Sequence, residues 1–261
     1  MTITNEEYHA DPAISASHLK AVMQSPYHYW SRYVDPDRKP VEPTAAMKLG
    51  SLAHCAILEP DELLQRYGVT PDRRSTVGRA AAEQMAAEGI EAVTSSDMAL
   101  ALSMAAAVRN HPAASALLQT GKAEQSFWWD DLSSGLRCKC RPDWYFGSTV
   151  VDIKTTTDAS PQAFARSVAT FAYHVQAAHY LAGLHGAERF VFVAVEKTYP
   201  HAVAVYELDA DALALGRTTR DNALDVIAGC RAADVWPGYS DTVQTLSLPR
   251  WATNPIQTET F

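Results

Sequence analysis

The sequence contains few cysteines, and their spacing excludes the usual uses of this residue. Four cysteines occur among 261 residues, namely Cys55, Cys138, Cys140 and Cys230. They fit neither a disulfide framework nor the Cys-x-x-Cys pattern of zinc and iron–sulfur sites. Cys138 and Cys140 alternate in a segment typical of a β-strand, so we expect them to pack in the protein.

Long apolar runs, linkers and repeats are also missing. No apolar segment approaches the roughly 20 residues that cross a bilayer. The N-terminal sequence lacks the basic and apolar regions of a signal peptide, so we expect a cytoplasmic protein. A 47% hydrophobic composition without Ser/Gly-rich linkers predicts one domain with one core over residues 1–261.

Positive charge is in deficit. The chain has 22 basic and 30 acidic residues, a formal net charge of −8. Contacts with nucleic-acid phosphates need Lys and Arg, so this balance counts mildly against a nucleic-acid partner. However, carboxylates gathered at a metal site would add to the negative total, and basic residues cluster locally at Arg73-Arg74 and at Arg137-x-Lys139-x-Arg141. The charge alone therefore leaves a nucleic-acid function open.

The sequence pattern divides the chain into three stretches. Residues 1–122 are mainly helical in character, residues 123–208 alternate as strands do, and residues 209–261 predict a long helix capped by Asp209 and a tail that wraps over the body. In the middle stretch we expect a three-stranded antiparallel meander and then, after two helices, two more strands; the five segments are Glu124–Trp129, Leu136–Phe146, Thr149–Lys154, Arg189–Glu196 and Ala202–Leu208. This order predicts an α/β fold with a central mixed β-sheet flanked by helices.

Helix signals in the first stretch are periodic apolar residues preceded by capping residues. They predict helices over Leu19–Gln24 (capped by Ser15 or Ser17), Thr44 to about Ile57, Asp61–Tyr67, Gly78–Ala87, Asp97–Asn110 (capped by Ser95 or Ser96) and Ala113–Leu118. We expect loops over Asp35–Pro43 and Thr70–Thr76, and a helix break at Ser25-Pro26.

Two acidic residues and a lysine lie close together in the middle stretch. Side chains alternate across a strand, so Asp152 and Lys154 point to one face while Ile153 points to the core. A turn at Gly147-Ser148 would fold the preceding strand back and bring Asp143 near Asp152. Two carboxylates attract a hard cation, and a lysine beside them can orient or deprotonate a water molecule.

An alternative interpretation applies to this motif. Asp-x-Lys is common on strands, where most such pairs form surface ion pairs. The apolar residues Val150, Val151 and Ile153 instead indicate a central strand, where an unpaired charge would be costly. The motif gains weight only together with other residues of the chain.

Four further residues are candidates for the same site. His54 lies in the second predicted helix and could add an imidazole ligand, although a lone helical histidine is usually structural. Glu124, at the start of the first predicted strand, could supply another carboxylate or be an ordinary strand-end residue. Gln176 and Tyr180 are four residues apart and share one helix face. They form either part of an amphipathic helix or a site in which the amide positions water or phosphate and the Tyr contacts the DNA backbone.

Taken in order, these motifs resemble those of a nuclease superfamily. Gly50-x-x-x-His54, Pro142-Asp143, Asp152-x-Lys154-Thr155 and Gln176-x-x-x-Tyr180 look like the PD-(D/E)xK superfamily in its RecB-like branch. Within it, the chain resembles the C-terminal nuclease domain of the exodeoxyribonuclease VIII (RecE) family almost end to end. The segments that carry this likeness are Glu7–Ser15, Cys138–Asp143, Tyr173–Gln176 and Thr245–Ala252. The likeness does not include the long N-terminal extension of the large bacterial form, so we expect a stand-alone nuclease of phage or prophage type.

The resemblance implies a role for each candidate residue. His54, Asp143 and Asp152, with the backbone carbonyl of Ile153, would ligate Mg²⁺ or Mn²⁺, and Glu124 would hold a second metal. Lys154 would orient and activate the attacking water. Gln176 and Tyr180 would complete the catalytic site.

The resemblance also implies an activity and partners. It predicts 5′→3′ digestion of linear double-stranded DNA to 5′-mononucleotides, a RecT-type single-strand annealing partner and a homo-oligomeric ring, tetrameric by analogy. The alternatives are another PD-(D/E)xK nuclease (an endonuclease or a single-strand exonuclease) and a non-catalytic DNA-binding member; the cysteine spacing disfavours a Cas4-like iron–sulfur nuclease. Candidates for gripping the 5′ end are Lys20, Arg73, Arg74 and Arg79.

Overall fold

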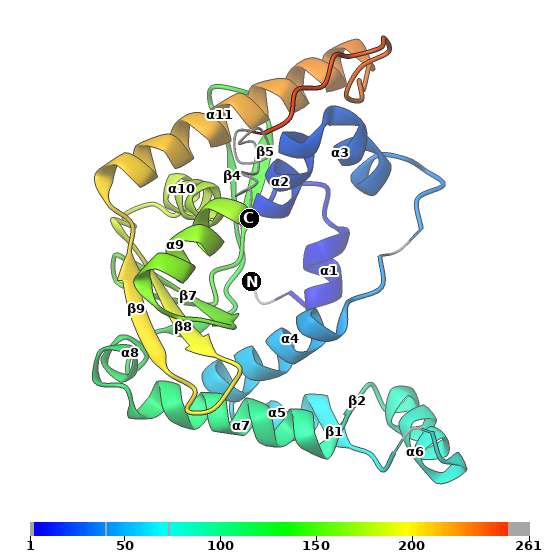
Figure 1. Cartoon of the computed structure of the whole chain (residues 1–261), viewed down its shortest axis with the longest axis vertical. Coiled ribbons are helices and arrows are strands. Elements are labelled where there is room, and N and C mark those ends of the chain that lie inside the picture. The colour runs from blue at the N-terminus through cyan, green and yellow to red at the C-terminus, as the bar shows by residue number, and fades with distance from the viewer. Residues whose placement is uncertain (1–2, 40, 73, 250–261) are drawn as a thin grey trace, which may run out of the picture.

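A five-stranded mixed β-sheet forms the centre of the protein (Figure 1). The computed structural model describes residues 3–39, 41–72 and 74–249. The strand order is β3 (Lys122–Ala123), β6 (Trp144–Phe146), β7 (Thr149–Thr156), β8 (Arg189–Glu196) and β9 (Val203–Glu207). In the described part of this sheet, β7 and β8 pair in parallel and the other neighbouring strands are antiparallel. The expected α/β fold with a mixed sheet flanked by helices is confirmed.

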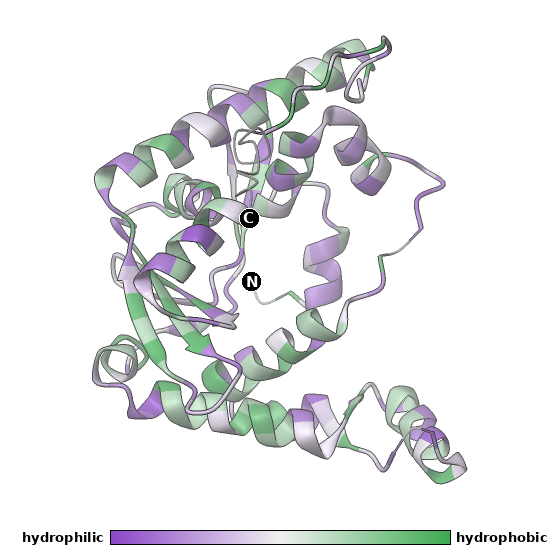
Figure 2. Ribbon diagram, viewed as in Figure 1, coloured by the Kyte–Doolittle hydropathy of each residue, from purple (hydrophilic) through white to green (hydrophobic). Residues whose placement is uncertain are grey.

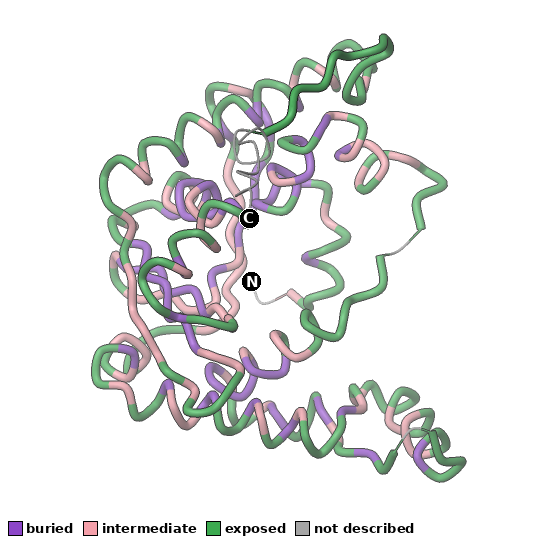
Figure 3. Tube along the Cα trace, viewed as in Figure 1, coloured by how far each residue is buried: buried purple, intermediate pink, exposed green. Residues whose placement is uncertain are grey.

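Helices cover both faces of strand β7. On one face, Val151 and Ile153 pack in a core with α4 (Ala45–Leu58) and α7 (Ser95–Asn110). On the other face, Val150 packs with residues of α9 (Pro161–Thr170) and α10 (Tyr173–Gly183). Hydrophobic residues follow β8 and α7 in Figure 2, and β7 and β8 are the buried strands of the sheet (Figure 3). β7 is therefore a central strand, as its apolar residues predicted.

The predicted three-stranded meander is wrong in its middle strand. Leu136–Phe146 is two strands, because pairing stops between β5 (Arg137–Cys140) and β6. β5 pairs with β4 (Phe127–Asp130) in a separate two-stranded sheet, whereas β6 pairs with β7 in the main sheet. Pro142 lies at the break and has no N–H to donate to a ladder. Glu124 also lies outside the strands: it follows β3, with a left-handed φ of 51°.

The expected helices of the first stretch are present with shifted ends. They are α2 (Ala16–Gln24, with Ser15 at its N-cap), α4 (N-cap Thr44), α5 (Leu63–Arg66), α6 (Thr76–Ala87), α7 and α8 (Pro112–Leu117). The cap of α7 is Thr94, not Ser95 or Ser96, since the Thr94 hydroxyl accepts the Asp97 N–H. The predicted helix break at Ser25-Pro26 is confirmed, because α2 ends at Gln24. Pro26 is the first residue of a new helix, α3 (Pro26–Tyr33), a position where a missing N–H has no cost.

Besides α3, three elements of this stretch have no counterpart in the prediction. They are the helix α1 (Asn5–Ala10) and the strands β1 (Tyr67–Val69) and β2 (Glu91–Val93), which pair in parallel. The predicted helix over Asp61–Tyr67 is thus a shorter helix followed by a strand. The expected loop over Thr70–Thr76 ends at Ser75, which caps α6.

The C-terminal helix α11 (Ala210–Ala233), capped by Asp209 as expected, packs Leu224 and Ile227 against Leu19 and other residues of α2. Beyond it, Trp236 stacks on Tyr29 with ring centroids 5.3 Å apart. The described part of the following tail is largely exposed (Figure 3), and the tail motif continues into residues that lie outside the described range. No described helix is long and apolar enough to span a membrane.

Candidate metal centre and active site

The β6–β7 hairpin brings the predicted acidic pair and lysine together. Gly147 forms the turn with a φ of 53°, and Trp144 pairs with Val151. Asp143, one residue before β6, accepts a 2.7 Å hydrogen bond from the Ile153 N–H through its Oδ2. The hairpin geometry expected from the sequence is therefore observed, and it places Asp143 beside the Asp152–Lys154 stretch of β7.

Asp152 is enclosed by two partners. Its side chain is 1% exposed, its Oδ1 accepts a 2.6 Å hydrogen bond from Gln176 Nε2, and its Oδ2 forms an ion pair with Lys154 Nζ. Burial lowers the pKa of Lys154, but the carboxylates of Asp152 and Asp143 outweigh this effect and leave it above its ordinary value. Lys154 is therefore a fixed positive charge, suited to orienting water or stabilising a phosphate.

A second group of ligands forms around Asp143. One ligand atom each from His54, Glu124 and Asp143 lies within 4.8 Å of the others, and His54 Nδ1 is 3.4 Å from Asp143 Oδ2. α4 approaches β7 closely at this point, since Ala53 is fully buried and the Gly50 position lies against Thr155. The structure thus brings His54 and Glu124 to Asp143, while Asp152 stays outside this group, bound by Gln176 and Lys154.

The backbone at Glu124 directs its carboxylate into the group. A φ of 51° is uncommon for a residue with a side chain, and it is held here by a 3.2 Å bond from the Glu124 N–H to the Asp143 carbonyl. Burial, followed by the negative charge of Asp143, raises the pKa of Glu124 to about 8. Burial also raises the pKa of Asp143, Asp152 adds to this, and His54 opposes it. A cation would relieve this repulsion.

The donor set fits a hard divalent cation. Two carboxylates and one imidazole are ligands that Mg²⁺ or Mn²⁺ accepts. The Ile153 carbonyl is a further candidate, because the N–H and C=O of one strand residue point to the same edge and the Ile153 N–H already reaches Asp143. The residues present could therefore hold a metal between α4, Glu124 and the hairpin.

Tyr180 takes a supporting position. Its hydroxyl donates a 3.2 Å hydrogen bond to the carbonyl of Arg141, two residues before Asp143. Burial raises the pKa of this hydroxyl well above its ordinary value, so it remains a donor. Tyr180 and Gln176 thus project from the same face of α10. Tyr180 holds the segment before Asp143, and Gln176 holds the Asp152 carboxylate.

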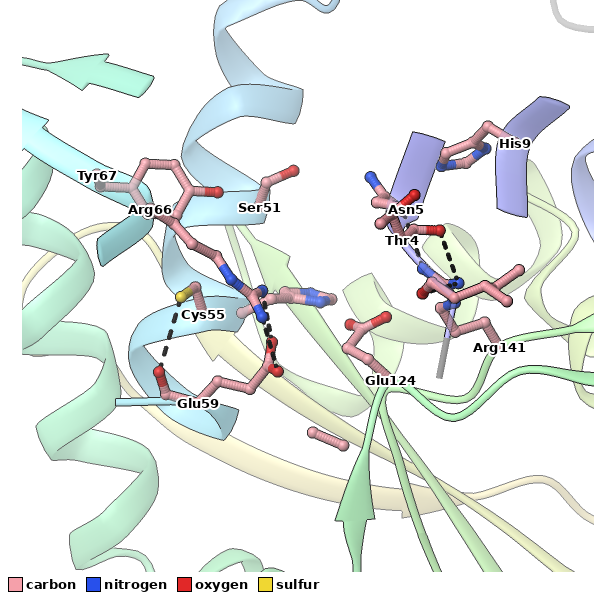
Figure 4. Close-up of a pocket in the computed structure, with 13 residues that line it drawn as sticks. Thr4, Asn5, His9, Ser51, Cys55, Glu59, Arg66, Tyr67, Glu124 and Arg141 are labelled. Atoms are coloured by element: carbon pink, nitrogen blue, oxygen red, sulfur yellow. Dashed lines mark hydrogen bonds and ion pairs between the residues drawn. The ribbon is translucent and has the colours of Figure 1, made fainter. Parts of the chain in front are cut away.

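An open cavity of about 710 Å³ borders the ligand group (Figure 4). His54 and Glu124 line it, and two arginines stand at its walls. Arg66 is paired with Glu59 by two hydrogen bonds of 2.8 and 3.0 Å, and Arg141 Nε donates to Ser126 at 2.7 Å. The other lining residues are Ile3, Thr4, Asn5, His9, Ser51, Cys55, Tyr67 and Ala123. A ligand in this cavity would lie directly against the candidate metal centre.

Sequence reasoning missed several of these residues. Arg66 and Glu59 join the site through the tertiary arrangement of α4 and α5, for which no local pattern exists. Tyr173 belongs to a segment that carries the family likeness but was given no role at the site, although it precedes Gln176 by three residues and so shares its helix face. It contacts Lys154, whose Nζ is 4.7 Å from the ring centroid.

The four candidates for gripping the 5′ end differ in position. Arg74 forms an exposed pair with Asp72, and Arg79 donates to the Arg74 carbonyl; neither lines the cavity. Arg73 lies outside the described residues. Lys20 is near Tyr173, with its Nζ 5.1 Å from the ring centroid.

The fold and the site define a PD-(D/E)xK-type, nuclease-like protein. Residues 15–249 match the PDDEXK-like domain of unknown function DUF3799, and the chain belongs to this family. The likeness to exodeoxyribonuclease VIII within the superfamily stays a prediction. No curated protein matches the chain.

Two solved structures are similar to the chain. One, from Eubacterium rectale, is provisionally described as an exonuclease; it has a TM-score of 0.69 and 15% identity, covering 95% of this chain and 96% of that one. The other is a phage-related exonuclease from Haemophilus somnus 129PT, with a TM-score of 0.36 and 11% identity, covering 61% and 84%. The first likeness extends over nearly the whole of both chains and confirms the fold.

Proposed function

We propose that the protein is a divalent-metal-dependent exonuclease that digests linear double-stranded DNA from 5′ to 3′. It would release 5′-mononucleotides and leave 3′ single-stranded tails for annealing recombination. One observation carries the proposal: the ligand group of His54, Glu124 and Asp143 borders an open cavity through His54 and Glu124, and Asp143 is hydrogen-bonded to Ile153, between Asp152 and Lys154 on β7. Family membership supports nuclease chemistry, and the resemblance in sequence supports the direction and the substrate.

Each residue would have a distinct task in hydrolysis. His54, Asp143 and Glu124, with the Ile153 carbonyl, would hold the ion, whose chemistry is to lower the pKa of water and to neutralise phosphate charge. Lys154 keeps its proton beside Asp152 and would orient the attacking water and stabilise the charge that develops on the phosphate. Gln176 holds Asp152, and Tyr180 holds the segment before Asp143.

We further propose the two partners that the resemblance implies. A RecT-type single-strand annealing protein would take up the 3′ tails. A homo-oligomeric ring would enclose the duplex, and a basic channel in such a ring would be compatible with the acidic net charge of the chain.

A cleavage assay tests the proposal. Linear duplex with 5′-phosphate ends, covalently closed duplex and single-stranded DNA are incubated with Mg²⁺, with and without EDTA. We expect rapid loss of the linear duplex only, and only without EDTA. Asp152→Ala should be inactive, whereas Asp130→Ala, which removes an exposed aspartate at the end of β4, should behave as wild type.

Other outcomes identify the alternatives. Cleavage of closed circles would indicate an endonuclease, and loss of single strands alone would indicate a single-strand exonuclease. DNA binding without any cleavage would indicate a non-catalytic member. Wild-type activity in Asp152→Ala would contradict the proposed site itself.

A further inference from the structure

Two lysines, one on a helix and one on a strand, lie close to the ring of Tyr173 beside the site. Lys20, on α2, has its Nζ 5.1 Å from the centroid of Tyr173, and the Nζ of Lys154 is 4.7 Å from the same centroid. Tyr173 is the first residue of α10, three residues before Gln176. Ammonium groups at this distance are attracted by an aromatic face, so Tyr173 holds both cations near Asp152.

Lys20 is half-buried and, unlike Lys154 and Lys139, has no anionic or hydrogen-bonding partner among the described residues. Lys154 has Asp152, and Lys139 donates to the carbonyls of Tyr8 and Asp11. Burial, followed by the positive charge of Lys154, lowers the pKa of Lys20 to about 8, against the opposing effect of Asp152. A half-buried ammonium without an anionic partner loses part of its hydration and gains no ion pair in return, so stability does not explain its presence.

The position of Lys20 is fixed by the packing of its helix. Leu19, Ala21 and Val22 are buried in the core between α2 and α11, and Ser15 caps the first turn. Lys20 is on the part of α2 that faces α10, and no residue of α2 lines the cavity beside His54 and Glu124. Lys20 therefore approaches the Asp152–Lys154 pair from outside that cavity.

We propose that Lys20 is a phosphate-binding residue of this site, and that its ammonium contacts a backbone phosphate of the DNA strand being cut. A phosphate would give Lys20 the anionic partner that the protein does not provide, at a point within reach of the Lys154 ammonium. The identity of the ligand as DNA rests on the proposed function; the presence of an anion site at Lys20 rests on the contacts described here.

The test compares Lys20→Met, which keeps the length of the side chain and removes its charge, with Lys20→Arg and with a control. Lys39→Met is the matched control, because Lys39 is an exposed lysine in the loop after α3. Duplex DNA binding is measured by fluorescence anisotropy in EDTA over a range of salt concentrations, and cleavage is measured in Mg²⁺.

We expect Lys20→Met to raise KM about 10-fold with kcat changed less than about threefold, because a charge-assisted bond to phosphate contributes about 1.5 kcal/mol or more. The slope of log K against log[salt] should become shallower by about 0.7 to 0.9, the value for one phosphate contact. Lys20→Arg should retain a KM and a salt slope close to those of wild type, and the control Lys39→Met should leave the KM and the salt slope unchanged. The melting temperature of Lys20→Met should equal or exceed that of wild type.

Substrate ends identify which phosphate Lys20 binds. An equal effect on duplexes with 5′-phosphate and 5′-hydroxyl ends assigns it to an internal phosphodiester, whereas an effect confined to 5′-phosphorylated duplex assigns it to the terminal phosphate. An unchanged salt slope together with an unchanged KM in Lys20→Met would overturn the proposal. If wild type cuts no DNA but Lys20→Met still reduces the slope, the phosphate contact stands and the proposed exonuclease activity fails.

Discussion

Asp152 shows how a local pattern and a distant contact combine at a single residue. The alternation of a strand predicts that Asp152 and Lys154 share a face, and they do. The second partner, Gln176, is 24 residues away, and its contact depends on how α10 packs on the sheet. Similarly, His54 and Glu124 were candidates for the same site as Asp143, but their meeting there depends on the close approach of α4 to β7 and on the left-handed backbone of Glu124.

The buried pair of Asp152 and Lys154 leads to a stability prediction. Asp152→Asn leaves Lys154, 16% exposed, without its ionised partner. We expect the free energy of unfolding to fall by about 3 kcal/mol, the usual cost of leaving one member of a buried pair unpaired. The double variant Asp152→Asn/Lys154→Met should recover most of this loss and remain inactive. Urea denaturation measures both, and a double variant less stable than Asp152→Asn would show that the pair is not coupled in this way.

The ligand group predicts a thermal response to metal. Mn²⁺ at about 100 times its Kd should stabilise the wild type by about 2.7 kcal/mol, measured as a rise in melting temperature that EDTA reverses. Asp143→Asn should abolish the rise because Asp143 contacts His54 and lies at the centre of the group. Glu124→Gln should reduce it, and Asp130→Asn should leave it unchanged. An equal rise in Asp143→Asn and wild type would place the metal elsewhere.

At the level of helices and strands, capping residues and apolar periodicity predicted most elements. α4, α11 and the strands β8 and β9 lie within a few residues of their expected positions. The error at Leu136–Phe146 has a physical cause: its residues favour a strand throughout, but Pro142 interrupts the ladder and the two halves join different sheets. Which strand each half pairs with is decided by tertiary packing, and strand propensity does not predict it.

The junction of α10 and β5 predicts a dependence of stability on pH. His179 is fully buried, and its Nε2 donates to the carbonyls of Ile14 and Lys139 at 3.2 and 3.1 Å. Burial, with Arg220 adding to it, lowers the pKa of His179 to about 4 from an ordinary value of 6.5. Between pH 6.5 and 4, His179 is protonated in the unfolded chain but stays neutral in the folded protein. The stability that is present above pH 6.5 is therefore lost as the pH falls towards 4.

The expected loss from His179 is about 3 kcal/mol between pH 6.5 and 4, at about 1.4 kcal/mol per unit. Buried His18, whose pKa is lowered to about 3, acts in the same direction. His179→Gln keeps a donor near the Nε2 position and removes the titration. Its melting temperature should therefore fall less steeply with acid than that of wild type, whereas exposed His185→Gln should follow wild type. Parallel slopes for wild type and His179→Gln would assign the acid sensitivity to other groups.

For the whole molecule, the cavity is the feature that the sequence conceals most. Its walls come from α1, α4, the α5–β1 region, Glu124 and Arg141, segments that share no local pattern. Its mixed lining also bears on the acidic balance of the chain, because Arg66 is paired with Glu59 and the hydrogen bonds of Arg141 are made within the protein. Of the two cavity-lining arginines, Arg66 has its charge balanced by Glu59, whereas Arg141 donates to neutral groups and keeps its charge, which alone offsets little of the net charge of −8 towards DNA.

The acidic net charge of the chain leads to a prediction about the proposed homo-oligomeric ring. If the protein works as the proposed ring, several copies would direct their basic groups at one duplex while their acidic surfaces face outward. Light scattering during size exclusion should then give a mass four times the 28.5 kDa of one chain. Linear duplex should be degraded processively, since an enclosed substrate cannot leave between cuts. A mass of one chain at working concentration would contradict the ring. In that case a single acidic chain would have to retain DNA through few cations, so cleavage should fall steeply with added salt and each encounter should end after few cuts.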